Sequence, residues 1–185
     1  MRNRLRLLAF AAVLFGVAPA GRACETEVTL TRGADKTYEV SGLFTVSAST
    51  DVVWGVLTDY EKIPSFVNSM RSSRVQETRP DGSALVAQKA VGDMFFLSKT
   101  MRILLEVRRT PEGLRFVDVG HEDFRTYEGV WEVRPTSEGV GVSYHLHARP
   151  GFAAPSFILT RAMRSGARKL LDQVRDEIVR RELAR

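Results

Sequence analysis

Five polar side chains have types that could carry acid–base chemistry or hold a polar ligand group: Gln88, Lys99, Asp118, Tyr127 and Tyr144. A buried tyrosine or lysine can polarise a carbonyl and stabilise an enolate, as a cyclase or dehydratase requires. Charged side chains are seldom buried without a partner, so we expect Lys99 and Asp118 to lie at strand ends, exposed to water. An enzymatic role for Tyr127, Tyr144 or Lys99 therefore stays open as an alternative.

Metal and nucleophile chemistry have weaker signals. His145 and His147 share one face of a predicted strand, and histidines at this spacing can chelate a metal ion. Their alternation with Tyr144 and Leu146 places them on the outer face, and the sequence shows no complete ligand set around them. It also shows no glycine-rich phosphate loop and no serine or cysteine nucleophile in a recognisable context. We therefore predict no catalytic residues of these kinds, no metal and no cofactor.

Large apolar side chains on the predicted inward faces form a candidate lining for an apolar ligand, and the methionines among them would add adaptable surface. The same side chains would also fill an ordinary core by packing against one another, and periodicity alone does not separate these readings. The candidate ligand-binding residues are Trp54, Phe66, Phe95, Met101, Ile103, Phe116, Tyr127, Trp131, Tyr144, Phe157, Met163 and Leu170.

The strands that would position these residues follow from alternating hydrophobicity and turn sequences. They are predicted over residues 38–48, 71–78, 83–91, 95–109, 114–119, 126–134 and 140–148. Residues 25–32 are polar and fit either an extra edge strand or a disordered leader. Because short turns join most successive strands, we predict an antiparallel meander.

Two kinds of helix complete the pattern. A short helix begins at Ser49 or Thr50, Pro64 breaks it, and Asp59 is expected to cap a turn. A further short turn should follow over residues 65–68. Residues 155–183 form a long amphipathic helix, with apolar side chains at helical spacing on one face and arginines and acids on the other. About 28 residues make a rod of roughly 42 Å, long enough to cover the sheet.

These elements predict an α+β fold in which a curved antiparallel sheet of about seven strands wraps around the long C-terminal helix, with two short helices after the first strand. Length and composition fit a single domain over residues 24–185. Without the four arginines of residues 1–23, the chain carries 23 basic and 22 acidic residues. So balanced a charge argues against nucleic acid as a partner.

The first 23 residues have the pattern of a secretory signal peptide. Arg2, Arg4 and Arg6 precede an apolar stretch too short to span a membrane, and small residues allow cleavage after Ala20 or Ala23. An uncleaved N-terminal anchor is the alternative. Cys24, the sole cysteine, could carry lipid, but Gly21 stands where lipoprotein signals usually have a large aliphatic residue. We expect a secreted, periplasmic protein.

Three stretches resemble the START-like superfamily, also called SRPBCC or polyketide cyclase/dehydrase-like, and most closely its coenzyme Q-binding, lipid-transfer group. They are Ser47–Trp54 (SASTDVVW), Leu57–Phe66 (LTDYEKIPSF) and Tyr127–Pro135 (YEGVWEVRP), within a resemblance over residues 38–180. The resemblance implies a helix-grip fold with a cavity between the sheet and the long helix. It does not specify the ligand.

The sequence thus predicts a binder of a lipid or isoprenoid quinone that acts as carrier or chaperone, and it favours this role over an enzymatic one without deciding between them. The alternatives are a cyclase or dehydratase acting on an aromatic or polyketide-like substrate, and an interaction domain with a filled core. Arginines on the outer face of the last helix fit either an ordinary solvated face or transient contact with anionic lipid headgroups.

Overall fold

The computed structural model of the chain describes residues 25–94 and 97–185. The predicted signal segment, Cys24 and Phe95 lie outside the described residues. The elements in chain order are β1 (Glu27–Arg32), β2 (Tyr38–Val46), α1 (Thr50–Thr58), the 3-10 turn η1 (Tyr60–Lys62), α2 (Ile63–Phe66), β3 (Met70–Thr78), β4 (Ala84–Met94), β5 (Leu97–Thr110), β6 (Gly113–Asp118), β7 (Phe124–Thr136), β8 (Gly139–Pro150) and α3 (Ser156–Leu183).

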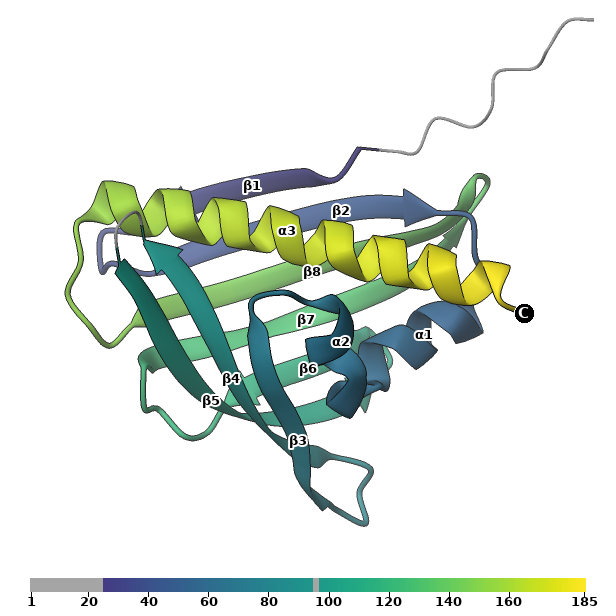
Figure 1. Cartoon of the computed structure of the whole chain (residues 1–185), viewed down its shortest axis with the longest axis horizontal. Helices are drawn as coiled ribbons and strands as arrows, with labels where there is room; N and C mark the ends of the chain where they lie inside the picture. The colour runs from purple at the N-terminus through teal and green to yellow at the C-terminus, as the bar shows by residue number, and fades with distance from the viewer. Residues whose placement is uncertain (1–24, 95–96) are drawn as a thin grey trace, which may run out of the picture.

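The described strands form one antiparallel sheet of eight strands in the order β1-β2-β8-β7-β6-β5-β4-β3. Figure 1 shows this sheet curving around α3, with α1 and α2 on the same side as α3. The α+β helix-grip prediction is confirmed. The strand number rises from about seven to eight because residues 27–32 pair along β2 as β1, so the leader alternative is wrong for these residues.

The inner face of the sheet follows from strict alternation. In β2, Tyr38, Val40, Phe44 and Val46 are buried, whereas Glu39 and Leu43 between them are exposed. At Gly42 the side chains of α3 pack directly against the sheet backbone, because a Cβ built there would lie 2.2 Å from Cδ1 of Leu171. A larger residue at Gly42 would therefore push α3 outward.

The connection between β2 and β3 differs in two details from the prediction. Ser49 caps α1 as expected, accepting a hydrogen bond from the Val52 N–H at 3.4 Å. Pro64 does not break that helix, because α1 has already ended at Thr58 and Pro64 lies in the first turn of α2. Asp59 makes no capping hydrogen bond among the described residues, and its carboxylate instead pairs with Arg181 of α3 at 3.0 Å.

The long helix α3 begins one residue after Pro155 and ends at Leu183, close to the predicted bounds. Its buried side chains are Leu159, Ala167, Leu171, Val174, Glu177 and Ile178. Gly166 is exposed, whereas Leu171 is fully buried. No helix among the described residues is long and apolar enough to cross a membrane.

Candidate functional site

A cavity of about 120 Å³ lies between the inner face of the sheet and the helices. Its walls come from α1, η1, α2, α3 and every strand from β3 to β8, so residues far apart in the sequence meet there. The lining is apolar or aromatic apart from Gln88 and the tyrosine hydroxyls. The lining residues are Val56, Leu57, Tyr60, Ile63, Phe66, Val67, Met70, Gln88, Leu105, Val107, Leu114, Phe116, Tyr127, Trp131, Tyr144, Leu170 and Val174.

The predicted ligand-binding residues divide into two groups. Those that line the cavity are Phe66, Phe116, Tyr127, Trp131, Tyr144 and Leu170. The others are placed elsewhere: Ile103 is buried in the core, and Trp54, Met101 and Met163 pack partly buried against that core. Phe157 is 67% exposed, so its predicted inward direction is wrong. Phe95 lies outside the described residues.

Aromatic rings form one wall of the cavity. The ring of Tyr144 lies 4.5 Å from that of Trp131 and 6.1 Å from that of Phe116, measured between centroids. Phe116 fits because Gly129 stands opposite it on β7, where a Cβ would lie 2.5 Å from the Phe116 ring. The wall offers flat apolar surface with two phenol hydroxyls.

Tyr127 and Tyr144 are the polar groups that project from this wall. Burial raises the pKa of Tyr127 and holds the pKa of Tyr144 well above its ordinary value of 10.0. The two phenols are hydrogen-bonded to each other. Both hydroxyls therefore stay protonated at neutral pH and act as neutral donors and acceptors.

Lys99 and Asp118 have different surroundings. The ammonium of Lys99 lies 2.6 Å from Asp123 and 4.7 Å above the ring of Phe152, and it does not line the cavity. The prediction that Asp118 lies in water is wrong. Its side chain is 1% exposed and lies on the inner face of β6, the face that carries the cavity wall. Gln88 lines the cavity and donates to Ser73 Oγ at 3.2 Å.

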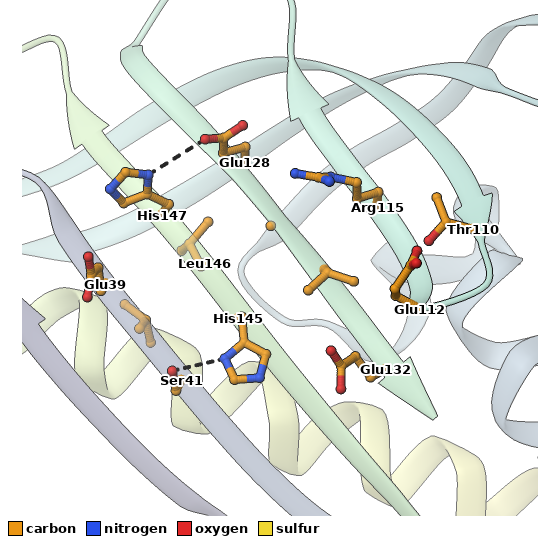
Figure 2. A pocket seen from close by; sticks show the side chains of 13 residues that line it. Glu39, Ser41, Thr110, Glu112, Arg115, Glu128, Glu132, His145, Leu146 and His147 are labelled. Atoms are coloured by element: carbon orange, nitrogen blue, oxygen red, sulfur yellow. Dashed lines mark hydrogen bonds and ion pairs between the residues drawn. The ribbon is translucent and has the colours of Figure 1, made fainter. Parts of the chain in front are cut away.

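A larger hollow of about 450 Å³ lies on the opposite, outer face of the sheet (Figure 2). It is bordered mainly by polar and charged side chains of β2, β6, β7 and β8. His147 lies 3.6 Å from Glu128, and His145 is hydrogen-bonded to Ser41 at 3.0 Å. This places both histidines on the outer face, as predicted. An apolar ligand would gain little in so charged and open a groove, so the smaller inner cavity is the better candidate site.

A metal centre has little basis in the part of the chain that the structure describes. No group of three or more histidine, cysteine, aspartate or glutamate side chains is arranged there to hold a metal ion. His145 and His147 therefore remain a surface pair whose contacts are with Ser41 and Glu128.

The lining residues that the sequence-based set left out are divided between strands whose inward faces were predicted and the helical segments. On β5, Leu105 and Val107 line the cavity, whereas Met101 and Ile103 of the same face lie farther along the strand. A period of two identifies the face of a strand but not the distance along it. Tyr60 and Ile63 come from the short elements η1 and α2, where periodicity has little signal, and Met70 is the first residue of β3, just before the predicted start of that strand.

The exposed side of α3 is strongly asymmetric in charge. Residues 156–169 contain Arg161, Arg164, Arg168 and Lys169 and no acidic residue. All four side chains are exposed, and Phe157 at the start of the helix adds an exposed ring. Residues 170–183 contain three arginines and four acids. Positive charge and an apolar side chain therefore gather in the first half of the helix.

Comparison with known proteins agrees with this architecture. A family model described as "Polyketide cyclase / dehydrase and lipid transport" matches residues 46–175. A search of the curated proteins found no match.

Several solved structures share this fold. TTHA0849 from Thermus thermophilus is 23% identical, with a TM-score of 0.65 over 76% of this chain and 97% of that one. A STAR-related lipid transfer protein from Xanthomonas axonopodis is 18% identical, with a TM-score of 0.64 over 87% and 96%. The Zhui aromatase/cyclase from Streptomyces sp. R1128 is 15% identical, with a TM-score of 0.65 over 78% and 95%.

At these identities the structural matches show the fold, while the family model covers well over half of the chain. Lipid transport and polyketide cyclisation both use sites for largely apolar molecules, which agrees with the apolar lining between sheet and helix. The chain therefore belongs to the START-like family of polyketide cyclases/dehydrases and lipid transport proteins.

Proposed function

We propose that this protein is an exported carrier that binds a lipid or isoprenoid molecule in the cavity between the sheet and α3. The observation that carries the proposal is the lining, in which apolar and aromatic side chains from six strands and the helices converge on one space. The family match supports a hydrophobic ligand. Export rests on the signal pattern of residues 1–23.

The size of the cavity sets a condition on binding. Ligand sites for drug-sized molecules are roughly 300–1,000 Å³, and an engineered cavity of roughly 150 Å³ holds a benzene. At about 120 Å³, the present cavity accommodates one ring or a short stretch of chain. A lipid therefore enters only if part of the cover moves and the cavity widens.

The first half of α3 is the segment best suited to move. It buries Leu159 and Ala167, whereas the second half buries Leu171, Val174, Glu177 and Ile178. Fewer buried contacts mean a smaller free energy for local opening. We infer that residues 156–169 swing away while residues 170–183 stay in place.

The same half of α3 suits contact with a membrane that carries anionic lipids. Its four cations complement the headgroup charge, each contributing about 1 kcal/mol near such a surface. The exposed Phe157 ring would enter the interfacial region. A carrier that opens at its membrane contact would take up ligand without exposing it to water.

A cyclase or dehydratase role has less support. Lys99 is held in an ion pair with Asp123 outside the cavity, so it is not placed to polarise a bound carbonyl. The phenols of Tyr127 and Tyr144 remain available as hydrogen-bond donors, but they serve a binding protein equally well.

The test of the carrier function is to fill the cavity. Leu170 lies on the cavity wall, so Leu170→Trp should occupy the space and abolish ligand binding in a protein that still folds. Val179→Trp, on the exposed side of the same helix, is the matched control. Native mass spectrometry of the protein as purified from cells should show a co-purifying lipid mass in wild type and Val179→Trp, but not in Leu170→Trp.

A wild-type protein that gives a clean unliganded mass, even after incubation with extracted membrane lipids, would contradict the proposal. Retention of the lipid mass in a folded Leu170→Trp variant would show that the ligand binds elsewhere.

The membrane contact has its own test. Arg161→Glu/Arg164→Glu should weaken binding to phosphatidylcholine vesicles that contain phosphatidylglycerol about tenfold or more, and leave the weak binding to pure phosphatidylcholine unchanged. Arg71→Glu/Arg74→Glu makes the same charge change at exposed positions of β3 and should have little effect beyond that of net charge. Equal losses in the two variants would exclude a specific docking face on α3.

A further inference from the structure

Among the lining residues that the structure describes, Gln88 is the one with a polar side chain that is not aromatic. It lies on the inner face of β4, two positions from the buried Val86, and its cross-strand neighbour on β5 is the buried Ile103. A polar side chain among apolar neighbours is costly unless its hydrogen-bonding groups find partners. The position of Gln88 therefore raises the question of what those partners are.

Ser73 supplies one of them. It stands opposite Gln88 on β3, it is 4% exposed, and its hydroxyl oxygen accepts a hydrogen bond from Nε2 of Gln88 at 3.2 Å. A serine hydroxyl can donate as well as accept, so Ser73 can hold either end of the amide. In both orientations β3 fixes one end of the amide and leaves the other end for a different partner.

The other end of the amide is accessible. Within the part of the chain that the structure describes, the side chain of Gln88 makes no second hydrogen bond, and the one unpaired polar side-chain atom that is fully buried there belongs to Asp118. Oε1 of Gln88 therefore keeps accessible surface, on a residue that lines the cavity. A ligand in the cavity can reach this end of the amide.

The rest of the wall offers no charge. None of the described residues that line the cavity is acidic, basic or a histidine. An ionised group that moves from water into such a site loses more hydration free energy than hydrogen bonds to a neutral amide return. The strands β5 and β6 separate Gln88 on β4 from Tyr127 on β7, so the amide is a polar point apart from the phenols.

We propose that Gln88 selects ligands whose polar end is neutral and forms hydrogen bonds, as a carboxamide or a hydroxyl does, and holds that end on the β4 side of the cavity. The inference rests on the proposed ligand-binding function and narrows its ligand class. The amide of Gln88 provides an acceptor oxygen and a donor N–H, so a group that both donates and accepts matches it best. A carboxylate or a phosphate would be excluded from the interior by its charge.

The test compares three compounds with one ring, the size that the cavity accommodates: benzamide, benzoate and isopropylbenzene. At pH 7 benzoate is ionised, whereas the other two are neutral and similar in shape to it. Benzamide should bind about tenfold or more tightly than benzoate, because the ion must enter without a charged partner. Dissociation constants come from NMR titrations of the protein freed of bound lipid. They are followed at the lining residues, so that benzoate bound to the basic surface of α3 is not counted.

Gln88→Met is the informative variant, because methionine is similar in length and has no amide. Its affinity for benzamide should fall about fivefold or more, while isopropylbenzene binds as tightly as to wild type or more tightly. Gln88→Leu should give the same result if Gln88→Met does not fold. Lys89→Met makes a similar change at the exposed neighbouring position of β4 and should leave all three affinities unchanged.

The outcomes separate this inference from the function it rests on. If benzoate binds in the cavity as tightly as benzamide, or if a folded Gln88→Met variant keeps the full affinity for benzamide, the proposed role of Gln88 is wrong and the cavity stands. If none of the three compounds shifts the signals of the lining residues, or if Leu170→Trp binds them as well as wild type does, the proposed ligand site is wrong and this inference falls with it.

Discussion

The two halves of α3 belong to one continuous helix but are held to the rest of the molecule in different ways. Residues 170–183 bury Leu171, Val174, Glu177 and Ile178, and Leu171 and Ile178 have no exposed surface. Residues 156–169 bury Leu159 and Ala167. The second half therefore carries most of the apolar contact that fixes the helix on the sheet.

Polar contacts sharpen the contrast. In the second half, Glu177 pairs with Arg180 and Arg181 at 2.7 Å, and Arg181 continues to Asp59 at the end of α1. Asp172 accepts a hydrogen bond from Thr26 at 2.6 Å. In the first half, Arg168 donates to the Thr26 carbonyl at 2.8 Å. The network ties the second half of α3 to the end of α1 and to Thr26, just before β1.

This difference separates a firmly packed half of the helix from a half with fewer buried side chains. The firmly packed half provides the cavity wall at Leu170 and Val174, and the other half lies toward the β8–α3 connection. If the comparison is right, mutations in the two halves should have unequal effects on global stability.

The largest expected effect comes from truncating the buried leucines. Leu171→Ala should lower the free energy of unfolding by about 4 kcal/mol, because the fully buried site beside Gly42 leaves a cavity. Leu159→Ala, in the first half, should lower it by about 2 kcal/mol, near the bottom of the range for buried leucines. Both free-energy losses are measured by urea unfolding, provided that the variants and wild type have the same slope of free energy against urea concentration. Equal losses in the two variants would contradict the proposed difference between the two halves of α3.

A smaller effect is expected from the buried carboxylate of the second half. The hydrogen bond from Arg180 is the main cause that holds the pKa of Glu177 below its ordinary value of 4.5, with Arg181 adding to it against the opposing effect of burial. The native state therefore binds fewer protons than the unfolded state in this range. The contribution is present above about pH 4.5 and is lost as the pH falls through the lower, folded pKa.

Glu177→Gln should accordingly cost about 2 kcal/mol at pH 7, since one partner of a largely buried ion-pair cluster loses its charge. The difference from wild type should shrink in urea titrations carried out below pH 4.5. Glu182→Gln, near the end of the same helix, is a control outside this cluster. A difference that stays constant with pH would mean that packing, and not charge, holds this half.

The sequence predicts the elements better than the contacts between them. Period-two alternation locates the strands from residue 38 onward, and helical spacing locates α3 to within one residue at its start. These patterns are local. Asp59 and Arg181 are far apart in the chain, so nothing in the neighbourhood of Asp59 indicates that it pairs with α3 and does not cap a turn.

The candidate site shows the same limit. Inward faces were predictable, and Phe116, Tyr127, Trp131 and Tyr144 indeed share one wall. The burial of Asp118 could not be predicted from the sequence. Its energetic cost is offset by hydrogen bonds from two backbone N–H groups, which come within reach only when the end of the β5–β6 pair has folded. Composition rules describe average charged residues, and Asp118 is an exception that tertiary structure creates.

The strand order also determines when the molecule can close. β2 pairs with β8, so Tyr38 can find its partner Ala148 only when the last strand is in place. The strands from β3 to β8 are sequential neighbours, and each can pair with the next by forming a hairpin. Such distant pairing slows folding and leaves apolar surface open in the meantime. The inner face of the sheet stays uncovered until β8 has paired with β2 and α3 has packed onto it. Apolar surface that chaperones can bind should therefore persist during folding until the last helix is in place.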